Sequence, residues 1–139
     1  MAIEHPVKLK VTLAPVQQPW VVVTVDKHTY SQQLISTTDF EFDFSATDQA
    51  VLTVQHHSKS DLDADTAVII QRIEFYGISD PRFVWAGKYY PDYPDHYQDK
   101  TPCLLNQDYL GWNGQYVLTF QVPVFSWIHQ VQDLGWLYQ

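Results

Sequence analysis

Hydrophobic and polar residues alternate along much of the first 77 residues. The clearest case is residues 39–44 (DFEFDF), where three phenylalanines alternate with three acidic residues. Successive side chains of a strand point to opposite faces of a sheet, so this pattern predicts a strand with one buried and one solvated face. Together with apolar runs, patterns of this kind predict strands at 6–13, 20–25, 29–35, 40–44, 50–57, 66–76 and 115–122.

Residues 66–76 (TAVIIQRIEFY) form the longest predicted strand, which we expect in the middle of the fold. The apolar run at 68–70 predicts burial on both faces of this strand. Polar turns separate the strands, and no stretch has the spacing of an amphipathic helix. The chain is therefore predicted to be all-β, a single antiparallel β-sandwich domain over 1–139 with its strands within 6–77 and 115–122.

Residues 79–114 interrupt the alternation. This segment contains four prolines and three glycines, which predicts a long Tyr-, Pro- and Asp-rich loop insertion with only a short strand at 83–85. The last sandwich strand is followed by an aromatic C-terminal arm at 123–139. An arm this apolar is expected to bury itself on its own sandwich or on another subunit. The candidate subunit-interface residues are Phe125, Trp127, Trp136 and Tyr138.

Composition and charge exclude several classes of protein. With 45% hydrophobic and 17% charged residues, the chain is too apolar to be disordered. Its net charge of −8 offers no basic surface for nucleic acid. Cys103 is the only cysteine, so no disulfide within the chain is expected. We find no signal peptide and no apolar run long enough to span a bilayer, which predicts synthesis in the cytoplasm without membrane insertion.

Three aspartates at alternate positions, Asp61, Asp63 and Asp65, form a candidate calcium site, because calcium binds several carboxylate oxygens. The pattern is not that of a helix-loop-helix calcium loop, since Thr66 and Arg72 stand where glycine and glutamate are needed. A solvated acidic turn is the simpler interpretation. Metal binding by histidines is not expected, because adjacent His56 and His57 would point to opposite faces of a strand.

Tyrosines and aspartates gather in the loop insertion. Such residues can stack on a sugar ring and accept hydrogen bonds from its hydroxyls, but they are equally typical of protein–protein contacts, which we favour here. The candidate ligand- or partner-binding residues are Tyr89, Tyr90, Asp92, Tyr93, Asp95 and Tyr97. No two carboxylates stand out as an acid–base pair for glycoside hydrolysis, so no catalytic residue is predicted and the protein is not expected to be an enzyme.

The course of the first half resembles a known family. Residues 21–34 (VVVTVDKHTYSQQL), 38–44 (TDFEFDF), 50–59 (AVLTVQHHSK) and 65–78 (DTAVIIQRIEFYGI) are similar to jelly-roll carbohydrate-binding modules of the calcium-dependent, xylan-binding type. The likeness covers roughly half of the chain. It implies a jelly-roll sandwich, glycan binding, and calcium near the three aspartates of the 61–65 loop.

The second half resembles a different group. Residues 73–94 (IEFYGISDPRFVWAGKYYPDYP) and 109–138 (YLGWNGQYVLTFQVPVFSWIHQVQDLGWLY) are similar to small virion proteins of tailed bacteriophages, especially those that infect cyanobacteria. This resemblance implies a non-enzymatic structural protein of the virion that acts in tail or fibre assembly and in host-surface attachment. Its partners would be copies of itself, other virion proteins and a host-surface glycan. A free-standing, calcium-assisted carbohydrate-binding module and a capsid decoration protein are the alternatives.

Overall fold

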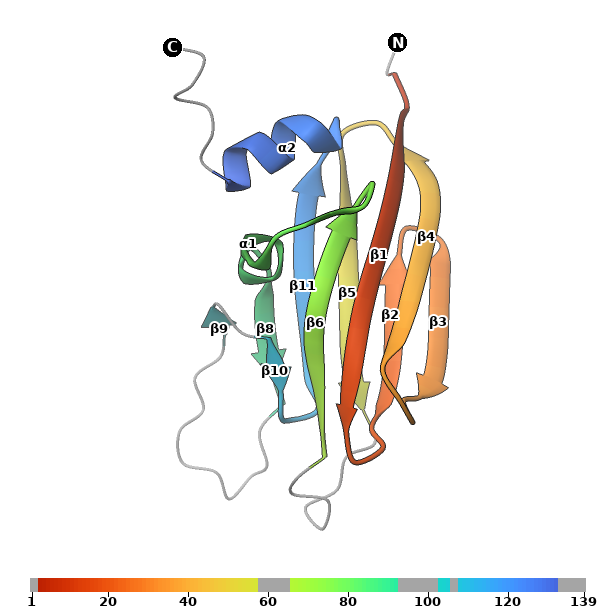
Figure 1. The fold of residues 1–139 in the computed structure, drawn as a ribbon, viewed down its shortest axis with the longest axis vertical. Coiled ribbons are helices and arrows are strands. Elements are labelled where there is room, and N and C mark those ends of the chain that lie inside the picture. Colours follow the sequence, from red (N-terminus) through yellow and green to blue (C-terminus); the bar gives the residue numbers. More distant parts are fainter. Residues whose placement is uncertain (1–2, 58–65, 93–102, 106–107, 133–139) are drawn as a thin grey trace.

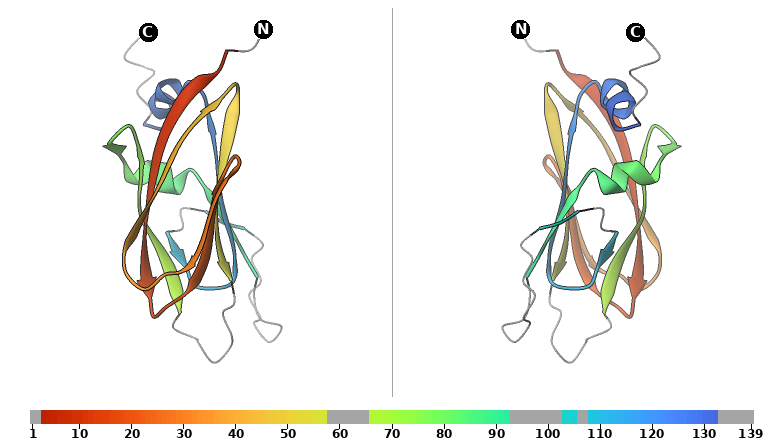
Figure 2. Two further views of the ribbon diagram at one scale, coloured as in Figure 1. Left: turned by 90° about the vertical axis from the view of Figure 1, so that its right-hand side faces the viewer. Right: turned by 90° about the vertical axis from the view of Figure 1, so that its left-hand side faces the viewer.

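Two antiparallel sheets pack face to face in the computed structural model, which describes residues 3–57, 66–92, 103–105 and 108–132. Figure 1 shows the long strands running side by side, and Figure 2 shows the sheets edge on as two layers. Sheet A has the strand order β10 (Tyr109–Leu110), β6 (Ala67–Phe75), β1 (His5–Val16) and β4 (Thr38–Ala46), with β7 (Ile78–Ser79) also paired to β6. Sheet B has the order β3 (His28–Gln33), β2 (Trp20–Val25), β5 (Gln49–His57), β11 (Gly114–Gln121), β8 (Lys88–Pro91) and β9 (Leu104–Leu105). The predicted antiparallel β-sandwich is confirmed.

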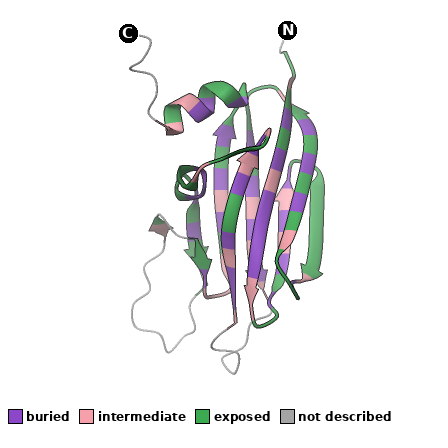
Figure 3. Ribbon diagram, viewed as in Figure 1, coloured by how far each residue is buried: buried purple, intermediate pink, exposed green. Residues whose placement is uncertain are grey.

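The alternation that predicted the strands is also what builds the core. In β4, Phe40, Phe42 and Phe44 point inward and are 2–9% exposed, whereas the acidic residues that alternate with them are exposed. Figure 3 shows the resulting stripes of buried and exposed positions along the strands. In β6, the predicted apolar run is buried at Val68 and Ile70 and half-buried at Ile69, between β1 and β10.

The prediction that 79–114 is a loop with only a short strand at 83–85 is wrong for the described part of this segment. The segment contains β8, β9, β10 and a helix, α1 (Pro81–Trp85), where a strand was predicted at 83–85. Asp80 caps this helix by accepting a hydrogen bond from the Arg82 backbone N–H, and proline occupies the first turn, as is common at helix starts. The helix forms because it inserts Phe83 and Val84 into the side of the sandwich, where both are buried.

The C-terminal arm begins with a second helix, α2 (Val124–Val131), which covers one end of the sandwich (Figure 1). Its Trp127 is 7% exposed and packs against Phe75, Phe83 and Phe120, with ring centroids 5.4, 5.5 and 6.0 Å away. The prediction of Trp127 as a subunit-interface residue is therefore wrong, because its ring fills the core of its own chain. Neither helix of the described residues is long and apolar enough to cross a membrane.

Of the other candidate interface residues, only Phe125 lies within the described part of the chain. Phe125 is half exposed and stacks on Tyr76, with ring centroids 5.1 Å apart. Trp136 and Tyr138 lie outside the described residues.

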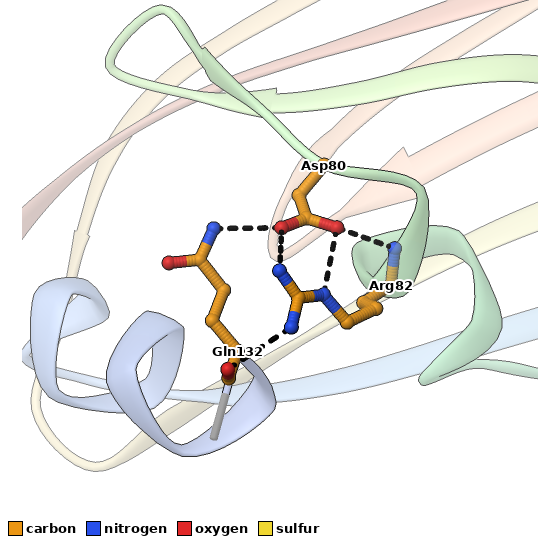
Figure 4. A network of polar contacts seen from close by, with 3 residues as sticks. All are labelled: Asp80, Arg82 and Gln132. Atoms are coloured by element: carbon orange, nitrogen blue, oxygen red, sulfur yellow. Dashed lines mark hydrogen bonds and ion pairs between the residues drawn. The ribbon is translucent and has the colours of Figure 1, made fainter. Parts of the chain in front are cut away.

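A network of polar contacts joins the two helices (Figure 4). Both side-chain oxygens of Asp80 accept hydrogen bonds from the Arg82 guanidinium, at 3.1 and 2.8 Å, and Gln132 Nε2 donates to Asp80 at 2.8 Å. Arg82 Nη1 in turn donates to the backbone carbonyl of Gln132 at 3.0 Å. The network therefore fixes the C-terminal end of α2 against the start of α1.

Asp80 should make stability depend on pH in the acid range. The Arg82 side chain, its backbone N–H and the Gln132 amide lower the pKa of Asp80 from 3.8 to about 2. Because this pKa is lower in the folded protein, its contribution is present above pH of about 4 and is lost as the pH falls toward 2. Asp80→Asn is expected to lower Tm at neutral pH and to give a shallower fall of Tm on acidification, measured by calorimetry. Asp26→Asn, in the exposed turn between β2 and β3, is the control, and a profile for Asp80→Asn parallel to wild type would contradict the prediction.

Candidate functional site

The two outer faces of the sandwich differ in charge. The outer face of sheet A carries cross-strand pairs of opposite charge: Lys8 faces Asp43 and Lys10 faces Glu41 in the register of β1 and β4. Lys10 Nζ also lies 3.3 Å from Glu74. A hollow of about 400 Å³ on this face is lined by these charged residues together with Leu9, Phe42, Tyr76 and Gly77. Since charges of both signs alternate on neighbouring strands, this face has the character of an ordinary solvated surface.

Sheet B is almost free of charge. Its six strands contain one lysine, Lys88, and no acidic residue or arginine. The outward positions are instead amides, hydroxyls, valines and two half-exposed rings, Trp20 and Tyr90. The near absence of charge on this face is unusual in a chain whose net charge is −8.

A hollow of about 480 Å³ lies on this neutral face, at the opposite end of the sandwich from α2 (Figure 1). The strand register builds its floor, because Gln115 of β11 pairs with Gln55 of β5 on one side and with Tyr90 of β8 on the other. Three neighbouring strands thus align two amides and a ring that is 44% exposed. The described residues that line the hollow are Gln55, His56, His57, Tyr90, Asp92, Asn113, Gly114 and Gln115.

The edge of the hollow is held by close backbone packing. Gly114 has φ of +151°, and a Cβ atom there would lie 2.3 Å from the Tyr90 carbonyl oxygen. Only glycine therefore lets β11 approach β8 so closely. Next to it, the Asp92 backbone N–H donates to the Asn113 carbonyl at 2.6 Å, which places both residues on the rim.

Buried Tyr89 supports the same edge from below. Its hydroxyl accepts a hydrogen bond from the Trp112 backbone N–H at 3.0 Å and donates to the Trp112 carbonyl. The ring is 1% exposed. The prediction of Tyr89 as a ligand- or partner-contacting residue is therefore wrong: neighbouring strand positions face opposite ways, so Tyr89 points into the core while Tyr90 points out.

The two adjacent histidines also face opposite ways, as predicted. His56 is fully buried, and its Nδ1 lies 3.0 Å from the Leu110 carbonyl oxygen, so Nδ1 must be the protonated, donating nitrogen. This bond ties β5 of sheet B to β10 of sheet A beneath the hollow. His57 lies on the outer face, with its ring centroid 6.3 Å from that of Trp20.

The structure places only two of the predicted loop residues, Tyr90 and Asp92, at the hollow. Tyr93, Asp95 and Tyr97 lie outside the described residues, as do the candidate calcium ligands Asp61, Asp63 and Asp65. Among the residues that are described, no group of three or more histidine, cysteine, aspartate or glutamate side chains could hold a metal ion.

The remaining residues at the hollow were missed by the sequence analysis. Gln55 and Gln115 lie 60 positions apart and meet only through strand register. The signal that could have pointed to them is the lack of charge in the strands at 20–25, 49–57 and 114–121. A strand face that is solvated but uncharged is unusual in an acidic protein.

The chemistry of the hollow is suited to binding. Each amide of Gln55, Gln115 and Asn113 offers both donors and an acceptor, and Asp92 accepts only. The exposed Tyr90 ring offers an apolar surface for stacking. Among the described residues of the lining, Asp92 is the only carboxylate. Hydrolysis of a glycosidic bond by the usual mechanism needs a pair of carboxylates.

Comparison with known proteins identifies the fold. No family model and no curated protein matches the chain. Two solved structures do: vCBM60 in complex with galactobiose matches with a TM-score of 0.54 and 16% identity, over 80% of this chain and 96% of that chain. The selenomethionine form of vCBM60 matches with a TM-score of 0.53 and 17% identity, over 81% of this chain and 89% of that chain. That structure is described as part of an evolutionary link, by circular permutation, between two families of calcium-dependent carbohydrate-binding modules. The chain therefore has the jelly-roll β-sandwich fold found in carbohydrate-binding modules, as predicted.

Proposed function

We propose that the protein binds carbohydrate without a catalytic role, through the hollow on the outer face of sheet B. The observation that carries this proposal is the alignment of Gln55, Gln115 and the exposed Tyr90 ring across three strands of an uncharged face. The fold that the chain shares with vCBM60 supports the proposal, since that protein has been seen with galactobiose bound.

The chemistry of a sugar matches that of the hollow. A pyranose ring has an apolar C–H face and a rim of hydroxyl groups that both donate and accept. The Tyr90 ring can stack on the apolar face of the sugar. The glutamine amides can donate hydrogen bonds to its hydroxyls or accept them, and Asp92 can accept a hydrogen bond from a hydroxyl. A protein partner with several charged residues at its interface would find few complementary charges among the described residues of this face, which are Lys88 and Asp92.

Replacing Tyr90 with alanine tests this proposal. A panel of neutral galacto-, xylo- and gluco-oligosaccharides, including galactobiose, with oligogalacturonides as acidic counterparts, is screened first, and affinities for the binders follow by calorimetric titration. Tyr90→Ala is expected to weaken binding at least about tenfold, equivalent to about 1.4 kcal/mol, as for an aromatic residue at the centre of a binding site. Tyr109→Ala, on β10 of sheet A and equally exposed, is the control and should bind as wild type. Unchanged affinity of Tyr90→Ala, or no binding of any neutral glycan, would refute the proposal.

We further propose that calcium assists this binding through Asp61, Asp63 and Asp65, which are the sequence-based candidates. The support is the calcium dependence of the module families to which vCBM60 is linked. The titrations are therefore repeated in a calcium chelator. Chelation should weaken binding by wild type and should leave a variant with asparagine at all three positions unaffected. Binding by wild type that ignores the chelator would contradict the calcium proposal alone.

We also propose, from the resemblance of residues 73–94 and 109–138, that the domain serves as an oligomeric structural protein of a phage virion. The half-exposed Phe125, stacked on Tyr76 beside α2, is the described residue that supports a contact with another copy. Light scattering of the purified protein would show an oligomer that Phe125→Ala weakens. A monomer at all concentrations would refute self-assembly.

A further inference from the structure

We propose that the neutral face binds an extended chain of several uncharged sugar units, laid across the strands from Tyr90 to a second aromatic platform, Trp20. This inference rests on the proposed carbohydrate binding and adds the length, direction and charge of the ligand. It also assigns a binding role to Trp20, which no sequence motif singles out.

Trp20 lies on the same surface as the hollow. It is the first residue of β2, is 43% exposed, and pairs in register with His57 of β5. The two rings lie 6.3 Å apart with an interplanar angle of 39°. His57 itself lines the hollow. The exposed surface is therefore continuous from the Trp20 ring, over His57, to Tyr90.

The strand order fixes the distance between the two rings. Sheet B runs β2, β5, β11, β8, so Trp20 and Tyr90 are three strand spacings apart, about 14 Å. The two residues are also offset along the strand direction. Trp20 pairs with His57, whereas Tyr90 is in register with Gln115 and Gln55, two residues before His57. Two residues of a strand span about 7 Å. The two offsets combine to about 16 Å between attachment points, which is longer than one sugar ring. A ligand that stacks on both rings must therefore be a chain.

The groups between the two rings suit the middle of such a chain. Gln55 and Gln115 lie on the two strands that separate Trp20 from Tyr90, and each amide can donate and accept. The two rings can stack on sugar units at either end of the bound stretch while the amides bind hydroxyls between them.

The ligand is expected to be neutral. Lys88 is the only charged residue in the strands of sheet B, and Asp92 on the rim would repel an acidic sugar. On the opposite face, residues of opposite charge are neighbours in the strand register, Lys8 with Asp43 and Lys10 with Glu41, and Lys10 forms an ion pair with Glu74. A polymer of uncharged, hydroxyl-rich units fits the amides and rings of sheet B without leaving a buried charge unpaired.

Chain length is the variable that tests this inference. Galacto-, xylo- and gluco-oligosaccharides of one to six units are titrated against wild type, Trp20→Ala and Trp85→Ala. Wild type should gain at least about tenfold in affinity between the disaccharide and the chain that first reaches both rings, with little gain beyond it. Trp20→Ala should bring the affinity for the hexasaccharide down to that of the disaccharide. Trp85→Ala removes an equally exposed tryptophan from α1 and should behave as wild type.

The possible results separate this inference from the proposed function. Equal affinity of wild type for the disaccharide and the hexasaccharide, or an unchanged hexasaccharide affinity in Trp20→Ala, would overturn the inference while leaving binding at Tyr90 intact. Tighter binding of oligogalacturonides than of their neutral counterparts would contradict the prediction that the ligand is uncharged. Absence of binding to every chain length would refute the proposed function itself.

Discussion

Replacing Trp127 with alanine is expected to lower the free energy of unfolding by about 3–5 kcal/mol, the usual cost of truncating a large buried aromatic side chain. The ring is the largest side chain that α2 buries in the core, beside Val124 and Ile128. It meets Phe75 of sheet A, Phe120 of sheet B and Phe83 of α1. Its loss would leave a cavity at the point where both sheets and both helices meet. The change is measured by urea denaturation monitored by far-UV circular dichroism, so that the signal does not rely on tryptophan fluorescence.

Phe125→Ala is the matched control on the same helix. Phe125 is half exposed and has one described ring contact, with Tyr76, so its removal should cost about 0.5–1.5 kcal/mol. If Trp127 instead served contacts between subunits, Trp127→Ala would change the mass of the particle in solution and leave the unfolding of the chain nearly unaffected. That outcome would contradict the placement of Trp127 in the core.

Gly114→Ala is expected to weaken glycan binding at least about tenfold and to destabilise the fold by about 1–3 kcal/mol, the range for overpacking. The new Cβ would lie 2.3 Å from the Tyr90 carbonyl oxygen and 2.8 Å from Pro91 Cα, so β8 must move away from β11. Tyr90 would move with it and lose its alignment with Gln115 and Gln55. The oligosaccharide titrations and the calorimetric Tm report the two effects.

Gly111→Ala provides the comparison. Its Cβ would lie 3.2 Å from the ring of Tyr109, a half-exposed side chain that has room to turn aside. This variant should bind glycan as wild type does. Binding by Gly114→Ala at wild-type affinity would mean that the contact of β11 with β8 does not shape the site.

Period-two alternation and short apolar runs were sufficient to predict the long strands, and alternation works best where one face of the strand is buried. β4 is the simplest example: its three phenylalanines are where the pattern puts them. The helices were missed for two reasons. α1 has five residues, too few for a helical period to show. In α2, the buried Val124, Trp127 and Ile128 do have helical spacing, but they follow a proline and stand in an aromatic segment that also suited an extended arm.

The candidate site was predicted only where residue type alone was informative. Tyr90 and Asp92 stood out as a ring and a carboxylate in one loop. Tyr89 was misassigned because 88–91 was not predicted as a strand, and without strand alternation there is no reason to separate neighbouring tyrosines. Gln55, Gln115 and Trp20 come from three strands, so nothing short of the sheet order could bring them together. The sequence resemblance to carbohydrate-binding modules agrees with the fold, and the virion role stays a prediction.

The aromatic cluster around Trp127 and the hollow on sheet B lie at opposite ends of the sandwich, since α2 and the hollow do (Figure 1). Substitutions separated by such distances usually have additive effects on stability. Positions 55, 57, 90 and 115, which are exposed or half-buried, can therefore diverge under selection while the core keeps the molecule folded. On the proposed function, a few changes on this face would alter glycan specificity without loss of the fold, which makes it a suitable starting point for directed evolution.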